Sequence, residues 1–308
     1  MEAKNNIQSQ QFHPFTKIYK LDTNSTMFNL NSFKPEDFNF FIPGEKLIQG
    51  KEAFILGSHQ DERRTPVKPD PETQKRKGYR SMQGQVFSFF GNNPFKGSGT
   101  LTRDEFGNIF VITAAHNYMQ VFDDLEFKAI EADGMLFDLG KDGVDKNIMR
   151  FMIQQIAVHP FYRKNSHFNC GYDIAIGKLD IENPDELAHL ISDDSWWSNI
   201  DEVELKQGDE ICVIGYPGEY DSELYEMKGT LTEIRRNRDG NRILVYNNID
   251  TTKGQSGGAI YALKAGINIR IGVHVGNDKG LRANIGTAIT PEIDDWIAKT
   301  IQILYPRV

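Results

Sequence analysis

The chain has 308 residues, of which 39% are hydrophobic and 25% are charged, an ordinary globular composition that can fill one large core or two moderate ones. Its formal net charge of −8 argues against nucleic acid as the main partner, because that function needs a basic surface. No stretch approaches the length of apolar sequence that spans a membrane, so the sequence predicts no transmembrane helix.

The N-terminal part of the chain gives no clear signal of regular structure. Residues 1–15 contain no uninterrupted apolar region and no small-residue cleavage site, so no secretory signal is predicted. Residues 1 to about 52 are polar and aromatic without a clear period, and we predict no helix or strand there. Residues 58–80 combine three prolines with dense, mostly basic charge, which predicts an extended surface connector.

From residue 85 onward the pattern is that of short strands separated by turn signals. Asp239-Gly240 is the strongest hairpin signal, and 104–107 is a second. The predicted strands are 85–90, 98–102, 108–113, 210–215, 229–236, 242–247, 259–263 and 267–275.

The chain closes with a predicted helix over 291–304. Thr290 is placed as its N-cap, and Pro291 stands at the first helical position. Apolar residues then recur at helical spacing on one face: Ile293, Trp296, Ile297, Ile301 and Leu304. Many strands followed by one amphipathic helix predict closed or sandwiched β-structure with the helix packed on it.

Three segments carry residue types suited to catalysis. His116 follows the β-prone run 111–113 and two alanines, so it stands at the end of a strand, where it can reach a cleft. Asp173 directly precedes an alternating apolar strand, and a buried carboxylate there needs donors such as an imidazole N–H. Ser256 lies between glycines that allow a tight backbone path, which can aim the amides of Gly254 and Ser256 at one point, as an oxyanion hole requires. Each segment alone also fits a structural histidine, a capping aspartate or an anion-binding glycine loop.

The three segments together, in the order His, Asp, Ser, resemble the chymotrypsin-like serine proteases. The closest resemblance is to their glutamyl endopeptidase branch, over roughly residues 55–300. It is clearest in 215–218, 228–229 and 251–258, and 272–274 matches a Gly-Val-His that follows the nucleophile in that branch.

The resemblance implies an all-β fold of two antiparallel six-stranded β-barrels, roughly residues 80–190 and 200–290, followed by the helix 291–304. Residues 1–53 would be an N-terminal extension of a protease domain that spans 54–308. The resemblance also implies a serine endopeptidase with protein or peptide substrates and no cofactor. Ser256 would be the nucleophile, His116 its general base and Asp173 the residue that orients the imidazole.

The resemblance gives two conflicting signals about substrate preference. In the glutamyl branch, residues that match Thr251 and His274 line the S1 pocket and bind an acidic P1 side chain, which predicts a preference for Glu or Asp. Asp250, six residues before the nucleophile, occupies the offset at which trypsin-like enzymes attract Lys or Arg. We give His274 the greater weight and keep Lys/Arg preference as an alternative.

Departures from the wider family bear on activation. Gln255 replaces the aspartate that pairs with a freed N-terminus in chymotrypsin-type zymogens, and Asn117 replaces a cysteine beside the catalytic histidine. Phe54 to Gly57 resemble the mature start of glutamyl endopeptidases. We therefore predict that residues 1 to about 53 form a pro-segment, an inhibitor that a cut near Glu52 removes.

Several alternatives remain open at this level. The chain could be a catalytically silent homologue that binds a partner through the same crevice, or a glycine-loop anion-binding domain. His159 and His167 lack the spacing of a metal site, so no metal is predicted. Cys170 and Cys212 could pair or remain separate thiols. Secretion is implied by the resemblance alone.

Overall fold

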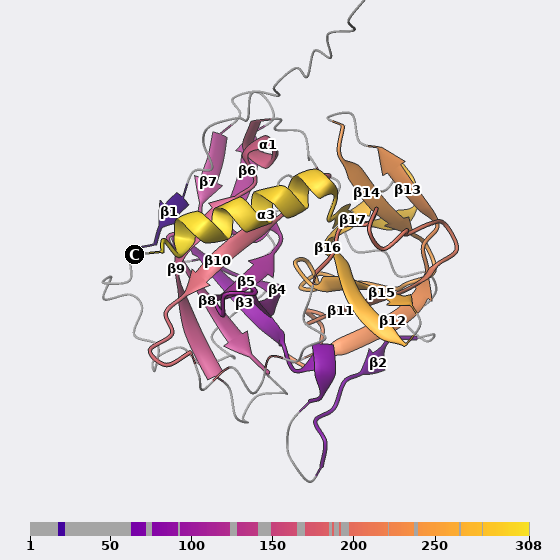
Figure 1. Cartoon of the computed structure of the whole chain (residues 1–308), viewed down its shortest axis with the longest axis horizontal. Helices are drawn as coiled ribbons and strands as arrows, with labels where there is room; N and C mark the ends of the chain where they lie inside the picture. Colours follow the sequence, from indigo (N-terminus) through magenta and orange to yellow (C-terminus); the bar gives the residue numbers. More distant parts are fainter. Residues whose placement is uncertain are drawn as a thin grey trace, which may run out of the picture.

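The structure is a computed structural model that describes residues 18–21, 63–71, 76–91, 93–123, 128–140, 149–164, 170–184, 187, 191, 197–220, 222–236, 240–264, 266–278 and 280–307. It consists of two β-units side by side, drawn in purple to magenta and in orange in Figure 1, with the C-terminal helix across the first. The predicted boundary of an extension at residue 53 lies outside the described residues.

The first unit is a closed antiparallel barrel of six strands. Its order is β9–β10–β5–β4–β3–β8, and β8 pairs back with β9. The bounds are β3 Gln83–Phe90, β4 Asn93–Arg103, β5 Ile109–Thr113, β8 Gly134–Leu139, β9 Met149–Val158 and β10 Ala175–Leu179. Beside it stand the hairpin of β6 (Met119–Asp123) with β7 (Lys128–Glu131) and the short helix α1 (Pro160–Lys164).

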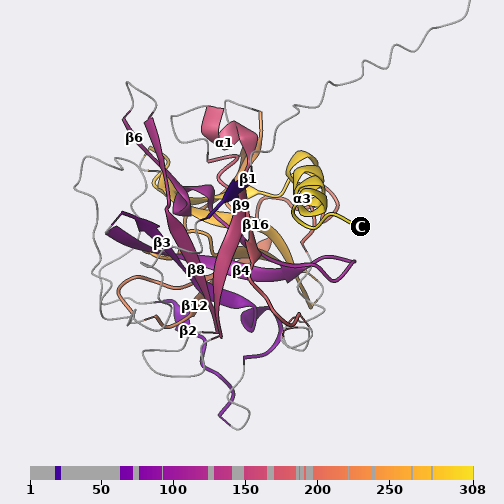
Figure 2. The same ribbon diagram turned by 90° about the vertical axis from the view of Figure 1, so that its left-hand side faces the viewer.

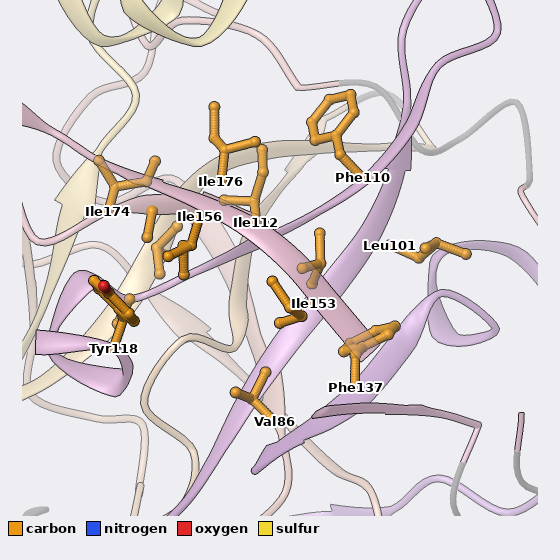
Figure 3. Close-up of a cluster of buried hydrophobic side chains, with 14 of the residues drawn as sticks. Val86, Leu101, Phe110, Ile112, Tyr118, Phe137, Ile153, Ile156, Ile174 and Ile176 are labelled. Atoms are coloured by element: carbon orange, nitrogen blue, oxygen red, sulfur yellow. The ribbon is translucent and has the colours of Figure 1, made fainter. Parts of the chain in front are cut away.

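Alternating apolar side chains of these strands fill the barrel. β5 has the sequence Ile-Phe-Val-Ile-Thr, whose β-branched and aromatic residues suit a pleated, buried strand, and all five of its residues are buried. Figure 3 shows the cluster, in which Ile112, Ile153, Ile156 and Ile176 meet between the strands. The barrel is therefore a packed core that holds the ends of its strands rigidly.

The second unit is an antiparallel sheet of eight strands around a separate core. Its order is β13–β14–β17–β16–β15–β11–β12–β2. The bounds are β2 Thr65–Pro66, β11 Glu210–Gly215, β12 Tyr225–Thr230, β13 Glu233–Arg236, β14 Arg242–Tyr246, β15 Ala259–Lys264, β16 Ile267–Asp278 and β17 Ala283–Ala288. β2 belongs to the segment predicted as a connector, and it pairs with β12 at the sheet's edge.

The C-terminal helix α3 spans Pro291–Leu304, as predicted, and joins the two units. The Thr290 hydroxyl accepts a hydrogen bond from the Ile293 amide, and the five apolar residues named from sequence are all buried. They pack in the same core cluster as the first barrel. The helix starts beside the second unit and crosses the first barrel, as Figures 1 and 2 show.

The sequence analysis did not predict β2, β6, β7, β8, β9 or β17. It also missed a strand in the N-terminal extension. β1 (Ile18–Lys20) comes from the N-terminal extension and pairs antiparallel with β9. β8 pairs with residues 149–152 of β9, and β1 continues beside residues 155–157. Tyr19 of β1 is buried, with its ring centroid 5.0 Å from that of Tyr118. A strand of three residues is too short to show a period, so no sequence pattern could reveal it.

Among the described residues no helix has the length and apolar character needed to cross a membrane.

Candidate active site

His116 and Asp173 are in direct contact through two hydrogen bonds. His116 lies in η3 (Ala115–Asn117), a single 3-10 turn that follows β5 and begins after the buried Ala114. Asp173 Oδ1 accepts the His116 backbone amide at 2.9 Å, and Oδ2 lies 2.8 Å from His116 Nδ1. A carboxylate accepts only, so Nδ1 carries the proton and Nε2 is left as the basic nitrogen. The carboxylate thus fixes both the tautomer and the position of the ring.

The Asp173 side chain is fully buried, with 0% of its surface exposed, whereas the His116 side chain is partly exposed, at 14%. A buried carboxylate is stable when its oxygens are hydrogen-bonded, and His116 supplies two of the donors. The imidazole therefore has one edge against a buried anion and retains access to solvent.

The loop that contains Ser256 takes a tight path that glycines make possible. Gly254 and Gly257 have φ values of 93° and 89°, in the left-handed region. A Cβ at Gly257 would lie 2.1 Å from the Ser98 carbonyl oxygen, so this position also excludes a side chain. The Ser256 hydroxyl donates to the Val275 carbonyl at 3.1 Å.

Two amides of this loop are left without acceptors. The amides of Gln255, Gly257 and Gly258 donate to the carbonyls of Thr252, His274 and Gln255. In the part of the chain that the structure describes, the amides of Gly254 and Ser256 donate to no group. These are the two amides named from sequence as an oxyanion hole, and they are available to an incoming oxygen.

Contacts across the two units hold the Ser256 loop against η3. Asn117 Nδ2 donates to the Ser256 carbonyl at 3.0 Å and to Thr113 Oγ1 at 2.9 Å. Ser98 of β4 donates its amide to the same carbonyl at 2.7 Å and its hydroxyl to the Gly254 carbonyl at 2.8 Å. The residue after His116 thus binds the main chain of Ser256 directly. Sequence reasoning missed Ser98 and noted Asn117 only as a departure.

The predicted pocket residue His274 is buried, with 1% of its surface exposed. Its Nδ1 lies 2.6 Å from the Tyr246 hydroxyl. Burial, together with the charge of the nearby His116, lowers the pKa of His274 to about 3. The ring is therefore neutral near pH 7, and it can act on a substrate only as a neutral hydrogen-bonding group.

Thr251 and Asp250 lie in the strand-to-loop segment before Ser256, and both are buried. Thr251 Oγ1 is a buried hydroxyl with no hydrogen-bond partner in the described structure. The Asp250 carboxylate is 2% exposed and binds the Arg63 guanidinium in a bidentate pair, at 2.9 Å and 2.7 Å. Asp250 therefore already has a cationic partner within the chain.

The other residues weighed from sequence lie apart from this site. Cys170 and Cys212 are both thiols, so no disulfide joins them. Burial raises the pKa of Cys212 to about 12. His159 is buried against the rings of Tyr172 and Trp296. His167 lies outside the described residues.

Comparison with known proteins gives matches in structure and none in sequence. No protein-family model matches the sequence, and no curated protein sequence is significantly similar to it. A Glu endopeptidase structure matches with a TM-score of 0.57 and 21% identity, over 78% of this chain and 97% of that one. Protease Anisep from Arthrobacter nicotinovorans matches with a TM-score of 0.55 and 17% identity, over 75% and 95%.

A thermostable serine protease, AL20, from an extremophilic microorganism matches with a TM-score of 0.51 and 14% identity, over 70% of this chain and 94% of that one. These neighbours are chymotrypsin-like serine proteases. The chain therefore has the chymotrypsin-like fold, and the all-β fold class predicted from sequence is confirmed.

Proposed function

We propose that the protein is a serine endopeptidase in which Ser256 is the nucleophile, His116 the general base and Asp173 the residue that orients His116. The observation that carries the proposal is the doubly bonded His116–Asp173 pair, held by Asn117 beside a loop with two available amides. The chymotrypsin-like fold of the chain supports it further.

The mechanism follows from these groups. Ser256 Oγ attacks the peptide carbonyl as His116 Nε2 takes its proton, and His116 later returns that proton to the leaving amine. Asp173 stabilises the imidazolium that forms. The amides of Gly254 and Ser256 donate to the oxyanion, an interaction of about 3 kcal/mol per donor in the transition state. The Ser256 hydroxyl has one proton, which it donates to the Val275 carbonyl in the structure, so it must give up that hydrogen bond when it donates to His116.

We further propose a preference for Glu or Asp at P1. Thr251 Oγ1 is a buried hydroxyl that a substrate carboxylate can satisfy. The Tyr246 hydroxyl has one proton, and both His274 Nδ1 at 2.6 Å and the Ile285 carbonyl at 3.3 Å can accept it. Donation along the shorter contact leaves the imidazole proton on Nε2, from which it can donate to the same carboxylate. The pairing of Asp250 with Arg63 disfavours the alternative of Lys or Arg at P1, because Asp250 is already neutralised. A match to a Glu endopeptidase agrees with this preference.

The experiment uses the full-length protein and a form without residues 1–53, each with fluorogenic peptides that differ only at P1: Glu, Asp, Lys or Phe. Ser256→Ala is the control, and a small organophosphonate reports whether Ser256 reacts covalently. We expect labelling of Ser256 and cleavage after Glu that Ser256→Ala abolishes. Cleavage after Lys would retain the nucleophile and overturn the P1 preference. Absence of both cleavage and labelling in both forms would favour a silent homologue that binds a partner.

We retain the proposal that residues 1–53 are a pro-segment removed near Glu52. It is supported by the resemblance of 54–57 to a mature N-terminus. N-terminal sequencing of active protein tests it, with a new N-terminus near residue 53 expected. Full activity of a chain that mass spectrometry shows to be intact would contradict it.

A further inference from the structure

Arg64 is a buried arginine at the outer edge of the second unit. It directly precedes β2, which pairs with β12, and the Val67 amide donates to the Leu224 carbonyl just beyond. These main-chain bonds fix the segment on the sheet. The Arg64 side chain is only 2% exposed, so its charge is taken out of water and must be compensated within the protein.

The Arg64 guanidinium binds three side chains at once. Nη1 donates to Thr252 Oγ1 at 2.8 Å and to Gln255 Oε1 at 3.4 Å, and Nη2 donates to Glu219 Oε1 at 2.7 Å. The guanidinium carbon also lies 5.2 Å from the ring centroid of Tyr220. The planar fork of arginine matches such a divergent set of acceptors, and the shorter point charge of lysine does not.

The acceptors of Arg64 are themselves connected. Gln255 Oε1 also accepts the Thr252 amide at 2.8 Å, and Thr252 Oγ1 donates to Glu219 Oε2 at 2.5 Å. Arg64, Thr252, Glu219 and Gln255 thus form a closed hydrogen-bonded ring. We call these four residues the Arg64 network.

The Arg64 network surrounds the turn 252–255 that leads into Ser256. Gln255 is the residue directly before the nucleophile, and its amide closes the turn by donating to the Thr252 carbonyl. The Lys253 carbonyl accepts from the Gly218 amide, and the Gly254 carbonyl accepts from Ser98 Oγ. These hydrogen bonds engage the Gln255 amide and the carbonyls of Lys253 and Gly254, whereas the amides of Gly254 and Ser256 donate to no described group.

We propose that Arg64 is a positioning residue for the oxyanion site. Its guanidinium holds the turn 252–255 in the shape that directs the Gly254 and Ser256 amides to one point, and it touches no reacting atom itself. The inference rests on the proposed protease function. It extends that function by proposing that a cation within the chain, Arg64, keeps the loop before Ser256 ordered.

The first test compares Arg64→Ala and Arg64→Lys with Arg80→Ala. Arg80 is a matched control, because it also forms a bidentate ion pair that fastens the N-terminal side of the chain to the second unit, with Glu226 of β12. We expect Arg64→Ala to lower kcat by about 10² with KM nearly unchanged, since an oxyanion contact acts in the transition state. Arg64→Lys should recover only part of this loss, and Arg80→Ala should leave kcat within about threefold.

A kcat loss in Arg64→Ala no larger than in Arg80→Ala would overturn the proposal. So would a change confined to KM, which would assign Arg64 to substrate binding.

The second test does not depend on catalysis. Hydrogen exchange of residues 251–258 is measured in Ser256→Ala, alone and combined with Arg64→Ala or Arg80→Ala. We expect the amides of Thr252, Gln255 and Gly257 to exchange faster only when Arg64 is removed, because the Arg64 network no longer closes the turn. Unchanged exchange would refute the positioning role. If neither the full-length protein nor the form without residues 1–53 cleaves peptides or reacts with the organophosphonate, the protease proposal fails and this measurement alone decides the role of Arg64.

Discussion

The Asn117 side chain lies against Gly97 of β4, and it has room there because glycine has no side chain. A Cβ at Gly97 would lie 2.4 Å from Asn117 Nδ2, so β4 can approach η3 only because residue 97 has no side chain. The Asn117 amide uses the space to bind the Ser256 carbonyl and Thr113 Oγ1. The Asn117 side chain therefore links the turn that contains His116 to the loop that contains Ser256.

Asn117→Ala is expected to lower kcat by about tenfold, because it removes a bond to the main chain of Ser256 and leaves two buried groups without that donor. Stability should fall by about 1–3 kcal/mol for the same reason. Asn108→Ala, which breaks an Asn–Asp104 contact in a surface turn, is the control. Peptide kinetics and urea unfolding measure the two effects, and equal kcat values for both variants would remove the positioning role of Asn117.

Arg63 and Asp250 form an ion pair beside the proposed S1 residue Thr251, and variants of the two residues give three states of charge there. Arg63→Ala leaves the Asp250 carboxylate without its bidentate partner, so we expect the ratio of Glu to Lys cleavage to fall by at least about tenfold. Asp250→Asn should raise that ratio, and the double variant should return it toward the wild-type value. The ratio of kcat/KM for the two peptides is the measurement. If this ratio is the same in all three variants, the Arg63–Asp250 pair does not determine specificity.

At the scale of elements, α3 and the first barrel enclose a histidine in an aromatic pocket. The His159 ring stacks on Tyr172 with centroids 4.6 Å apart and meets Trp296 of α3 edge-on at 4.9 Å. Its amide donates to the carbonyl of Ile174, next to Asp173. Burial alone lowers the pKa of His159 to about 3. The packing of α3 on this barrel is therefore compatible only with a neutral imidazole.

This burial predicts a loss of stability in acid. The unfolded chain binds a proton at His159 near its ordinary pKa of about 6.5. The folded chain does not bind it until about pH 3. The stabilisation is therefore complete above pH 6.5 and is lost as the pH falls toward 3, by about 2–3 kcal/mol at pH 4.5.

The measurement is urea unfolding at pH 7 and pH 4.5 in the Ser256→Ala background, which prevents self-cleavage. His159→Phe, which keeps an aromatic ring in the pocket, should lose about 2–3 kcal/mol less than its parent between the two pH values. If both proteins lose the same free energy of unfolding, a group other than His159 causes the loss of stability in acid.

At the scale of the whole molecule, the site exists only where the two units dock. His116 and Asp173 come from the first barrel, whereas Ser256 comes from the loop between β14 and β15 of the second unit. Ser98 and Asn117 bond across the boundary, and α3 fastens the second unit's C-terminal end to the first barrel. The N-terminal extension takes part in the same architecture, because β1 covers an edge of β9 (Figure 2).

Removal of residues 1–53 is therefore expected to cost stability. Loss of β1 removes the buried side chains of Tyr19 and Leu21 and uncovers the β9 edge. Burial of two such side chains contributes about 2–5 kcal/mol. Urea unfolding of full-length and 54–308 proteins, both with Ser256→Ala, measures the difference. Tyr19→Ala should reproduce much of the loss, while Lys20→Ala, exposed on the same strand, should not. Equal stability of the two lengths would mean that β1 contributes nothing.

The sequence alone determined those features that depend on neighbours along the chain. The cap and apolar face of α3 were readable because a helix is built from residues three and four apart. His116, Asp173 and Ser256 could be named because each lies in a short segment with a recognisable pattern. β3, β4, β5, β11, β14, β15 and β16 followed from their turns and apolar patterns, whereas β6 to β9 and β17 were not predicted.

Only the tertiary structure decided which distant residues support those three. Arg63 and Asp250 are separated by 187 positions, Arg64 and Gln255 by 191, and Asn117 and Ser256 by 139. No periodicity or local propensity encodes such pairs, because they arise from the closure of a barrel, the docking of two units and the path of one edge strand. The residues proposed to carry the chemistry can be identified from the sequence. The residues that hold them in place come together only when the chain is folded.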